Sequence, residues 1–201
     1  GGASTTTMTL TNAETIVASG GAGTTTVTAQ ARAASTTASS VTVTGDAIST
    51  FTIDGTAATT DVAAVTTSAA AVTANIGNTE AIETVTLNTA AASTVTLNGT
   101  AKFTTLDVVS SGDVTLVADG EISGKTITDN AGNITVNYTQ AAASDLDAVG
   151  AANINLMASS GHAMTVASGQ LVSVSNTVAL NATQTFTVAG TGTTDTITVA
   201  L

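Results

Sequence analysis

The sequence has no cysteine, proline or tryptophan, and aromatic residues make up only 2% of its 201 residues. The absence of cysteine excludes disulfide bonds and thiolate chemistry. Because aromatic side chains are scarce, any core must be built from valine, isoleucine, leucine and alanine. Such thin side chains suit a narrow, repetitive interior better than a broad globular one.

Basic residues are almost missing as well, since three of them stand against fourteen acidic residues and the formal net charge is −11. Nucleic-acid binding needs clusters of lysine and arginine, so this composition excludes a protein that binds the phosphate backbone. It also disfavours adsorption to an anionic membrane, and no apolar run is long enough to cross a bilayer. We therefore expect that the protein neither binds nucleic acid nor inserts into a membrane. Binding of divalent cations is compatible with its acidic charge.

The abundant residues are threonine, alanine and valine, and they predict strands. β-Branched residues favour half-buried pleated surfaces, and a disordered chain would be poor in them. Residues 84–87 and 94–97 both have the sequence Thr-Val-Thr-Leu, in which apolar residues alternate with polar ones. This is the period of a strand with one buried face. Similar runs recur about every ten residues from 79 onward, so we expect a stack of short strands.

Two all-β architectures fit this rhythm: a parallel β-solenoid with two or three strands in each coil, and antiparallel β-sandwich domains. A sandwich usually has larger core aromatics and tight Asn-Gly hairpins, and this sequence has one Asn-Gly pair and few aromatics. The solenoid is therefore favoured. Asparagines in the turns predict ladders of stacked side chains; they are Asn88, Asn98, Asn130, Asn133, Asn153, Asn176 and Asn181.

The spacing of the strand-like runs differs between two parts of the chain, residues 1–75 and residues 76–201. The first part is a less regular β segment, with strands expected at 7–10, 26–28, 41–44 and 51–53, and it is a candidate sub-domain. The second part is the solenoid-like segment. Its main interruption, residues 141–149, is interpreted as a short helical turn or a lateral loop.

Residues that could perform catalysis are few. His162 is the only histidine, and no second histidine or thiolate could complete a site with it. The glycines at 20–23 lack the lysine of a phosphate-binding loop. No basic or aromatic group is available to shape a sugar pocket around Asp145 and Asp147. We therefore predict no catalytic residue and no enzymatic activity.

Calcium is the cofactor that the sequence favours. Calcium takes six to eight oxygen ligands from carboxylates, amides and carbonyls in loose geometry. Acidic residues concentrate in the second half, and Asp129 lies among them. The alternative is that these carboxylates only keep a sparsely charged surface soluble. The candidate metal ligands are Asp107, Asp113, Asp119, Glu121, Asp145 and Asp147.

Pairs of threonines separated by one residue suggest a further possibility. Such pairs project from one face of a strand, and flat threonine ladders resemble the ice-binding faces of some solenoid antifreeze proteins. The simpler explanation is that threonine suits the outward face of a strand. The pairs are Thr84/Thr86, Thr94/Thr96, Thr126/Thr128, Thr185/Thr187 and Thr196/Thr198.

The strand at 79–88 (TEAIETVTLN), followed by Leu-Asp-Val at 106–108 and Gly-Asp-Val-Thr-Leu at 112–116, resembles the body of bacterial surface-layer (S-layer) proteins. The nearest type is the Gram-negative kind that is exported by type I secretion and carries RTX-like calcium modules. Residues 190–198 (GTGTTDTIT) resemble an RTX nonapeptide, although Gly-Thr-Gly replaces Gly-Gly-x-Gly and no consecutive repeat follows.

This resemblance implies a secreted, non-enzymatic subunit of a lattice on the bacterial cell surface, with calcium at its contacts. The expected partner is the same chain, in a lattice or a fibre, and cell-surface polysaccharide is expected to bind through regions outside this sequence. The alternatives are a spacer in a repetitive adhesin and a subunit of an extracellular filament. The opening Gly1-Gly2 lacks the features of a signal peptide, as expected for a mature form, a fragment or a protein with a C-terminal export signal.

Overall fold

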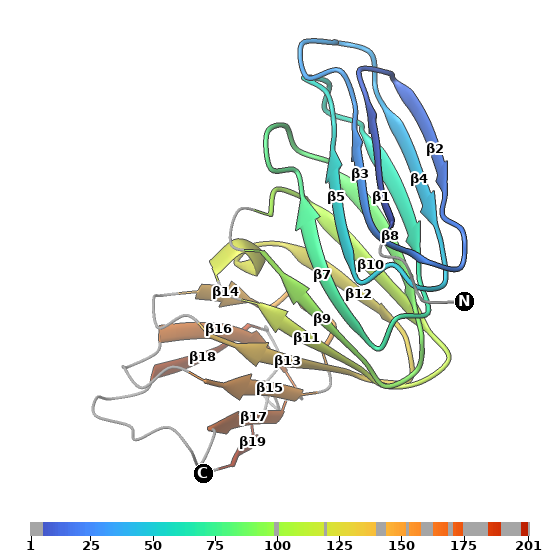
Figure 1. Cartoon of the computed structure of the whole chain (residues 1–201). Coiled ribbons are helices and arrows are strands. Elements are labelled where there is room, and N and C mark those ends of the chain that lie inside the picture. The colour runs from blue at the N-terminus through green and yellow to red at the C-terminus, as the bar shows by residue number, and fades with distance from the viewer. Residues whose placement is uncertain are drawn as a thin grey trace.

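The protein is an all-β solenoid in which parallel strands stack into sheets (Figure 1). The computed structural model describes residues 6–98, 101–118, 120–139, 144–151, 153–157, 163–168, 171–174, 185–189 and 198–200. Within them the chain alternates between two sides of the body, so that odd-numbered strands form one sheet and even-numbered strands form the opposite side.

Sheet A contains the odd-numbered strands in chain order. They are β1 (Thr6–Thr11), β3 (Thr24–Gln30), β5 (Thr50–Asp54), β7 (Ala71–Ile76), β9 (Ser93–Leu97), β11 (Val114–Ala118), β13 (Ile134–Tyr138), β15 (Asn153–Leu156), β17 (Leu171–Val174) and β19 (Thr198–Ala200).

Two shorter sheets hold the even-numbered strands. Sheet B consists of β2 (Thr15–Ser19), β4 (Ser40–Thr44), β6 (Val62–Thr66), β8 (Thr84–Thr89), β10 (Thr105–Ser110) and β12 (Thr126–Asn130). Sheet C consists of β14 (Ser144–Leu146), β16 (Ala163–Ala167) and β18 (Thr185–Ala189). A single parallel bridge, between Ile127 and Val149, joins the chain around β12 to the segment after β14.

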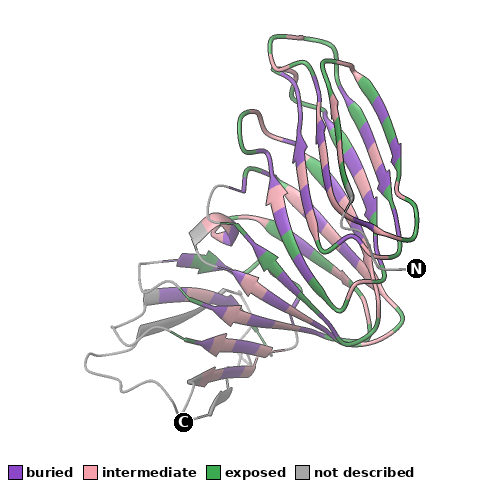
Figure 2. Ribbon diagram, in the orientation of Figure 1, coloured by how far each residue is buried: buried purple, intermediate pink, exposed green. Residues whose placement is uncertain are grey.

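Alternating side chains form the core between the sheets. In β4, Val41 and Val43 are buried while the residues beside them face outward, and the same stripes run along most strands in Figure 2. The inward side chains stack from coil to coil, as in the row that joins Val43, Val65 and Leu87. Each strand therefore buries its apolar side against its own sheet and the opposite one, which no single strand could do alone.

Every pairing among the described strands is parallel, so the solenoid prediction is confirmed and the antiparallel sandwich is wrong. Some of the asparagines named above bond to a side chain of the preceding coil, which is an asparagine for Asn98 and an aspartate for Asn130 and Asn133. The Asn98 amide donates to the side-chain oxygen of Asn75 in the preceding coil. Asn133 donates in the same way to Asp113 at 3.1 Å, and Asn130 donates to Asp107.

Three strands of the first part were not predicted, namely β2, β6 and β7. The last two are rich in alanine, which fits either face of a strand and blurs the polar and apolar alternation. The segment predicted as a helical turn or loop at 141–149 is also different, because Ser144–Leu146 forms strand β14 and pairs with β16. There Ser144 and Leu146 are buried, and the ladder with β16 outweighs the local helix propensity of alanine.

The ladders of both sheets run through the boundary predicted at 75/76. In sheet A, β7 pairs with β5 and β9; in sheet B, β6 pairs with β4 and β8. The division into two domains remains a prediction. The only helical element among the described residues is a 3-10 turn, Gly120–Ile122, so no described helix could span a membrane.

Candidate functional site

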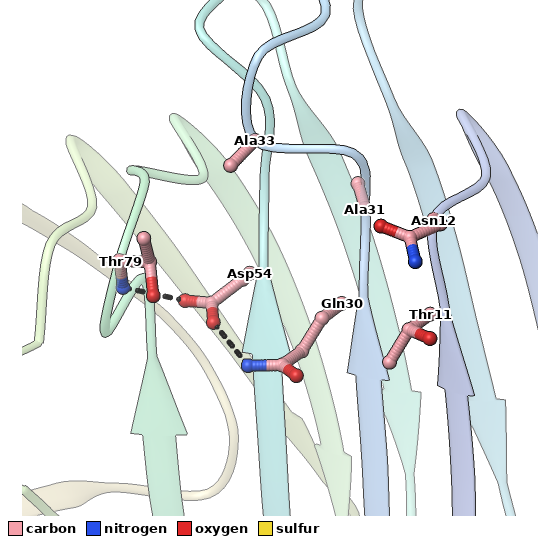
Figure 3. Close-up of a pocket in the computed structure, with 7 residues that line it drawn as sticks. All are labelled: Thr11, Asn12, Gln30, Ala31, Ala33, Asp54 and Thr79. Atoms are coloured by element: carbon pink, nitrogen blue, oxygen red, sulfur yellow. Dashed lines mark hydrogen bonds between the residues drawn. The ribbon is translucent and has the colours of Figure 1, made fainter.

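One polar pocket opens at the corner where the coils leave sheet A after β1, β3 and β5 (Figure 3). Its volume is about 330 Å³. It lies beyond the carboxyl ends of these strands, where parallel stacking brings polar side chains from successive coils together. Its lining residues are Thr11, Asn12, Gln30, Ala31, Ala33, Asp54 and Thr79.

Asp54 is the one charged residue in this lining, and it is 3% exposed. One carboxylate oxygen accepts a hydrogen bond from Gln30 Nε2 at 2.7 Å, and the other accepts one from the Thr79 backbone N–H at 3.0 Å. Figure 3 shows both bonds. The pocket lining offers hydrogen-bonding groups but neither a histidine nor a second carboxylate, so it contains no pair of groups for acid–base catalysis.

Two basic residues lie beside this pocket. Arg32 Nη2 donates to the Asn12 carbonyl at 3.4 Å, and Lys102 Nζ donates to the Thr79 carbonyl at 3.0 Å. Both cations therefore bond to backbone oxygens of lining residues, and they satisfy carbonyls at a corner of the stack. These two hydrogen bonds hold the corner in place, and no bound ligand is needed to account for the positions of the two cations.

A second buried carboxylate, Asp61, precedes β6 and is completely buried. It accepts hydrogen bonds from the backbone N–H groups of Ser39 and Thr56 and from the Thr56 hydroxyl. Burial by itself raises the pKa of Asp61, but these hydrogen bonds outweigh it and hold the pKa below its ordinary value. The Asp61 N–H in turn donates to Glu83 Oε2 at 2.8 Å. Asp61 thus connects three successive coils and has a structural role.

The predicted metal ligands are spread over several elements. Asp107 lies in β10 on the outer face of sheet B and accepts from Asn130, while Asp113 lies in an exposed turn and accepts from Asn133. Glu121 belongs to the 3-10 turn, and Asp119 lies outside the described residues. Among the described residues, no three acidic or histidine side chains come together as a metal site. The assignment of calcium to these residues remains a prediction.

Asp145 and Asp147 lie close together, since the Asp147 N–H donates to Asp145 Oδ1 at 3.3 Å. Asp147 also shares an open hollow of about 460 Å³ with Asp129, between β12 and the segment after β14. Asp129 already accepts the N–H groups of Ala131 at 2.9 Å and Ile134 at 3.0 Å. The hollow therefore holds two carboxylates, one of which caps the following turn.

The threonine pairs predicted from the sequence lie on different faces. Thr84/Thr86 and Thr126/Thr128 lie in sheet B, while Thr94/Thr96 lies in sheet A. Thr185 and Thr187 belong to β18 in sheet C. His162 and Thr196 lie outside the described residues.

A larger array on the outer face of sheet A was not anticipated. Strands β1, β3 and β5 each present a threonine pair in register. In β7, and in β9 with the residue that follows it, a threonine and an asparagine two positions later take the same places. Alternation of threonine with apolar residues is common in strands, so no single strand indicates the array. The array becomes evident only when successive coils, which differ in length, are aligned by their strand pairing. The ten residues, called the threonine face below, are Thr7, Thr9, Thr26, Thr28, Thr50, Thr52, Thr73, Asn75, Thr96 and Asn98.

Comparison of the chain with protein-family models, with curated proteins and with solved structures finds no match.

Proposed function

We propose that this chain is a non-enzymatic structural subunit of a self-assembling extracellular layer, an S-layer lattice on a bacterial surface. The observation that supports the proposal is that, among the described strands, both sheets end at one end of the stack in a strand that is paired on one side. Among the described strands, β1 pairs only with β3, and β2 pairs only with β4 (Figure 1). A free strand edge presents unpaired N–H and C=O groups that can bond to a strand of another molecule.

The geometry of β2 shows which groups are available. The Ser40 N–H donates to the Glu14 carbonyl at 2.8 Å, and the Gly20 N–H donates to the Thr44 carbonyl at 2.7 Å. Because neighbouring residues of a strand point their backbone groups to opposite sides, the N–H of Val17 faces away from β4. Val17 is also 67% exposed, the highest value among the large hydrophobic residues described.

A second copy of the chain is the occupant that this edge fits. The parallel ladder already repeats through the molecule, so another parallel strand continues it without a new type of contact. Met8 and Leu10 in β1 are only partly buried against the core, and a further coil would cover them. Head-to-tail contacts of this kind give open filaments when they do not close into a ring, and a sheet needs lateral contacts between such filaments as well.

A spacer in a repetitive adhesin is the second candidate. Strands of this solenoid pair only with their neighbours in each sheet, so the stack can be lengthened by further coils of the same polypeptide. The edge would then be covered within one chain, and the isolated segment would remain a single particle.

The substitution Val17→Lys tests the lattice against the spacer. A charge on the edge strand opposes strand addition, so we expect the wild-type chain to form sheets and the variant to remain monomeric. Fibres of the wild-type chain would indicate an extracellular filament instead. Val62→Lys is the matched control, because Val62 is 45% exposed on the same sheet but lies in β6, which is paired on both sides. Sedimentation velocity and electron microscopy, at high protein concentration with millimolar calcium, measure the outcome.

A wild-type chain that stays monomeric under these conditions would reject the lattice. Loss of assembly in V62K, with assembly of V17K unaffected, would show that the chains contact each other through the outer face of sheet B and not through the edge strand. Titration calorimetry examines the calcium expectation separately. No heat of binding and no change in melting temperature at millimolar calcium would remove calcium from the proposal.

A further inference from the structure

The threonine face is a two-dimensional grid of similar side chains on one side of sheet A. Its first column joins Thr7, Thr26, Thr50, Thr73 and Thr96 through successive strand pairings. Its second column joins Thr9, Thr28, Thr52, Asn75 and Asn98. Neighbouring strands lie about 4.8 Å apart and alternate residues of a strand lie about 6.6 Å apart, which sets the two repeats of the grid.

The grid is uncharged and accessible. None of its ten residues is buried, and none is ionisable, in a chain whose net charge is −11. Its asparagines are held in place, because Asn75 Nδ2 donates to the Phe51 carbonyl at 3.0 Å and Asn98 donates to Asn75. The face is therefore regular, and part of its side-chain order exists before any ligand binds.

The fold does not require threonine at these positions. The first column continues through β11, β13, β15 and β17, where the corresponding residues are Val117, Asn137, Asn155 and Ser173. The outward rows of sheet B contain Val62 and Asp107 among their threonines. Equivalent positions thus tolerate other residues, whereas five consecutive coils of sheet A keep hydroxyl and amide groups in two columns.

A ligand that uses this regularity must itself repeat in two dimensions. A flexible chain gains nothing from a periodic grid, and binding of polysaccharide by stacking would need exposed aromatic rings. Phe51, Phe103 and Tyr138 are buried, and none of the ten residues of the threonine face is aromatic. An ordered lattice of water molecules fits better, because each threonine hydroxyl can replace a lattice water while its methyl group fills the adjacent hollow.

We propose that the threonine face binds the surface of ice. The repeats of the grid are of the same order as those of the ice lattice, and the absence of charge avoids hydration shells that would compete with ice-like order. Rigid strands hold the array in the binding geometry, so little conformational entropy is lost on binding. This activity is separate from assembly, which uses the strand edges at the end of the stack.

The double variant Thr28→Lys/Thr52→Lys tests the proposal. Both residues lie in the centre of the grid on adjacent strands, and lysine there interrupts both the spacing and the neutrality. The matched control is Thr42→Lys/Thr86→Lys, which makes the same change on the outward row of sheet B. Nanolitre osmometry and an ice-recrystallisation assay measure activity, and circular dichroism verifies folding.

We expect the wild-type chain to separate its freezing point from its melting point and to inhibit recrystallisation. The T28K/T52K variant should lose most of this activity, and T42K/T86K should keep it. A folded wild-type chain without either activity would overturn the proposal, and so would an equal loss in the two variants. Binding to cellulose or chitin powder that T28K/T52K abolishes, without activity on ice, would assign the face to a crystalline polysaccharide instead.

Discussion

At the scale of single residues, the buried carboxylates show how polar groups enter a thin apolar core. Asp61 has no exposed surface, yet it accepts hydrogen bonds from Ser39 in the preceding coil and from Thr56 in its own. Burying a charge is costly unless hydrogen bonds replace its hydration. Here three donors replace it, and the same contacts connect neighbouring coils.

Replacing Asp61 by asparagine should lower the free energy of unfolding at neutral pH by about 1–3 kcal/mol, because an amide cannot accept all of these hydrogen bonds. The pKa of Asp61 is depressed in the folded protein. Its contribution is therefore complete above the unfolded pKa of about 3.9 and is lost as the pH falls through the folded pKa. Urea unfolding at neutral pH and near pH 3 should show that the difference between wild type and D61N shrinks in acid.

Asp46→Asn is the control for this prediction, because Asp46 lies in an exposed turn. It should change stability by no more than about 0.5 kcal/mol. A difference between wild type and D61N that stays constant with pH would mean that the amide fails for steric reasons and not because the charge is absent.

At the scale of elements, the strands were more predictable than the corners. The Thr-Val-Thr-Leu runs mark β8 and β9 directly, because their side chains alternate between the core and the outside. The contacts of Asp54 and Asp61 could not be found in this way. Gln30 and Thr79, which bond to Asp54, lie 24 and 25 residues away, so no local pattern reveals them. Polar residues separated by the length of one coil, such as Ser39 and Asp61, which are 22 positions apart, could have indicated the second site.

The corners contain two glycines with left-handed backbone that differ in their surroundings. Gly77 follows β7 with φ of 63°, and a Cβ there would lie 2.4 Å from the Lys102 carbonyl oxygen. Gly124 has φ of 67°, and a Cβ there would meet nothing within 4 Å. The pair therefore separates the cost of the backbone conformation from the cost of close packing between coils.

We expect Gly124→Ala to destabilise the protein by about 1–2 kcal/mol, the cost of a left-handed conformation for an L-residue. Gly77→Ala should cost more, because it adds a clash with the backbone of the next coil. Thermal and urea unfolding of both variants measure the difference. Equal losses of stability in the two variants would show that the backbone at Lys102 moves to accommodate the added methyl group and that the two coils are not tightly packed at this point.

At the scale of the whole molecule, stability is distributed along one dimension. Each strand inside a sheet pairs with the strands one coil before and one coil after it, as β8 pairs with β6 and β10. In such a stack the total stability is approximately a sum of coil terms and terms between neighbours. The threonine face results from the same repetition.

Deletion of residues 84–104 removes one complete coil and should leave a folded solenoid. Thr84 and Thr105 are register partners, so Thr105 takes the place of Thr84 after the deletion. Deletion of residues 84–92 is the matched control, because it removes β8 of sheet B, leaves β9 of sheet A complete and breaks the alternation between the sheets. Circular dichroism and thermal unfolding should show a cooperative β protein in the first case only. Unfolding of both would mean that the coils are not interchangeable.

The repeated parallel pairing of strands also sets the length of the molecule. Since each coil occupies one strand spacing, gain or loss of a complete coil changes the length of the body in steps of about 4.8 Å and leaves its width unchanged. Duplication of the gene segment for one coil would therefore alter the reach of the protein in discrete increments, while the lateral faces keep their chemistry.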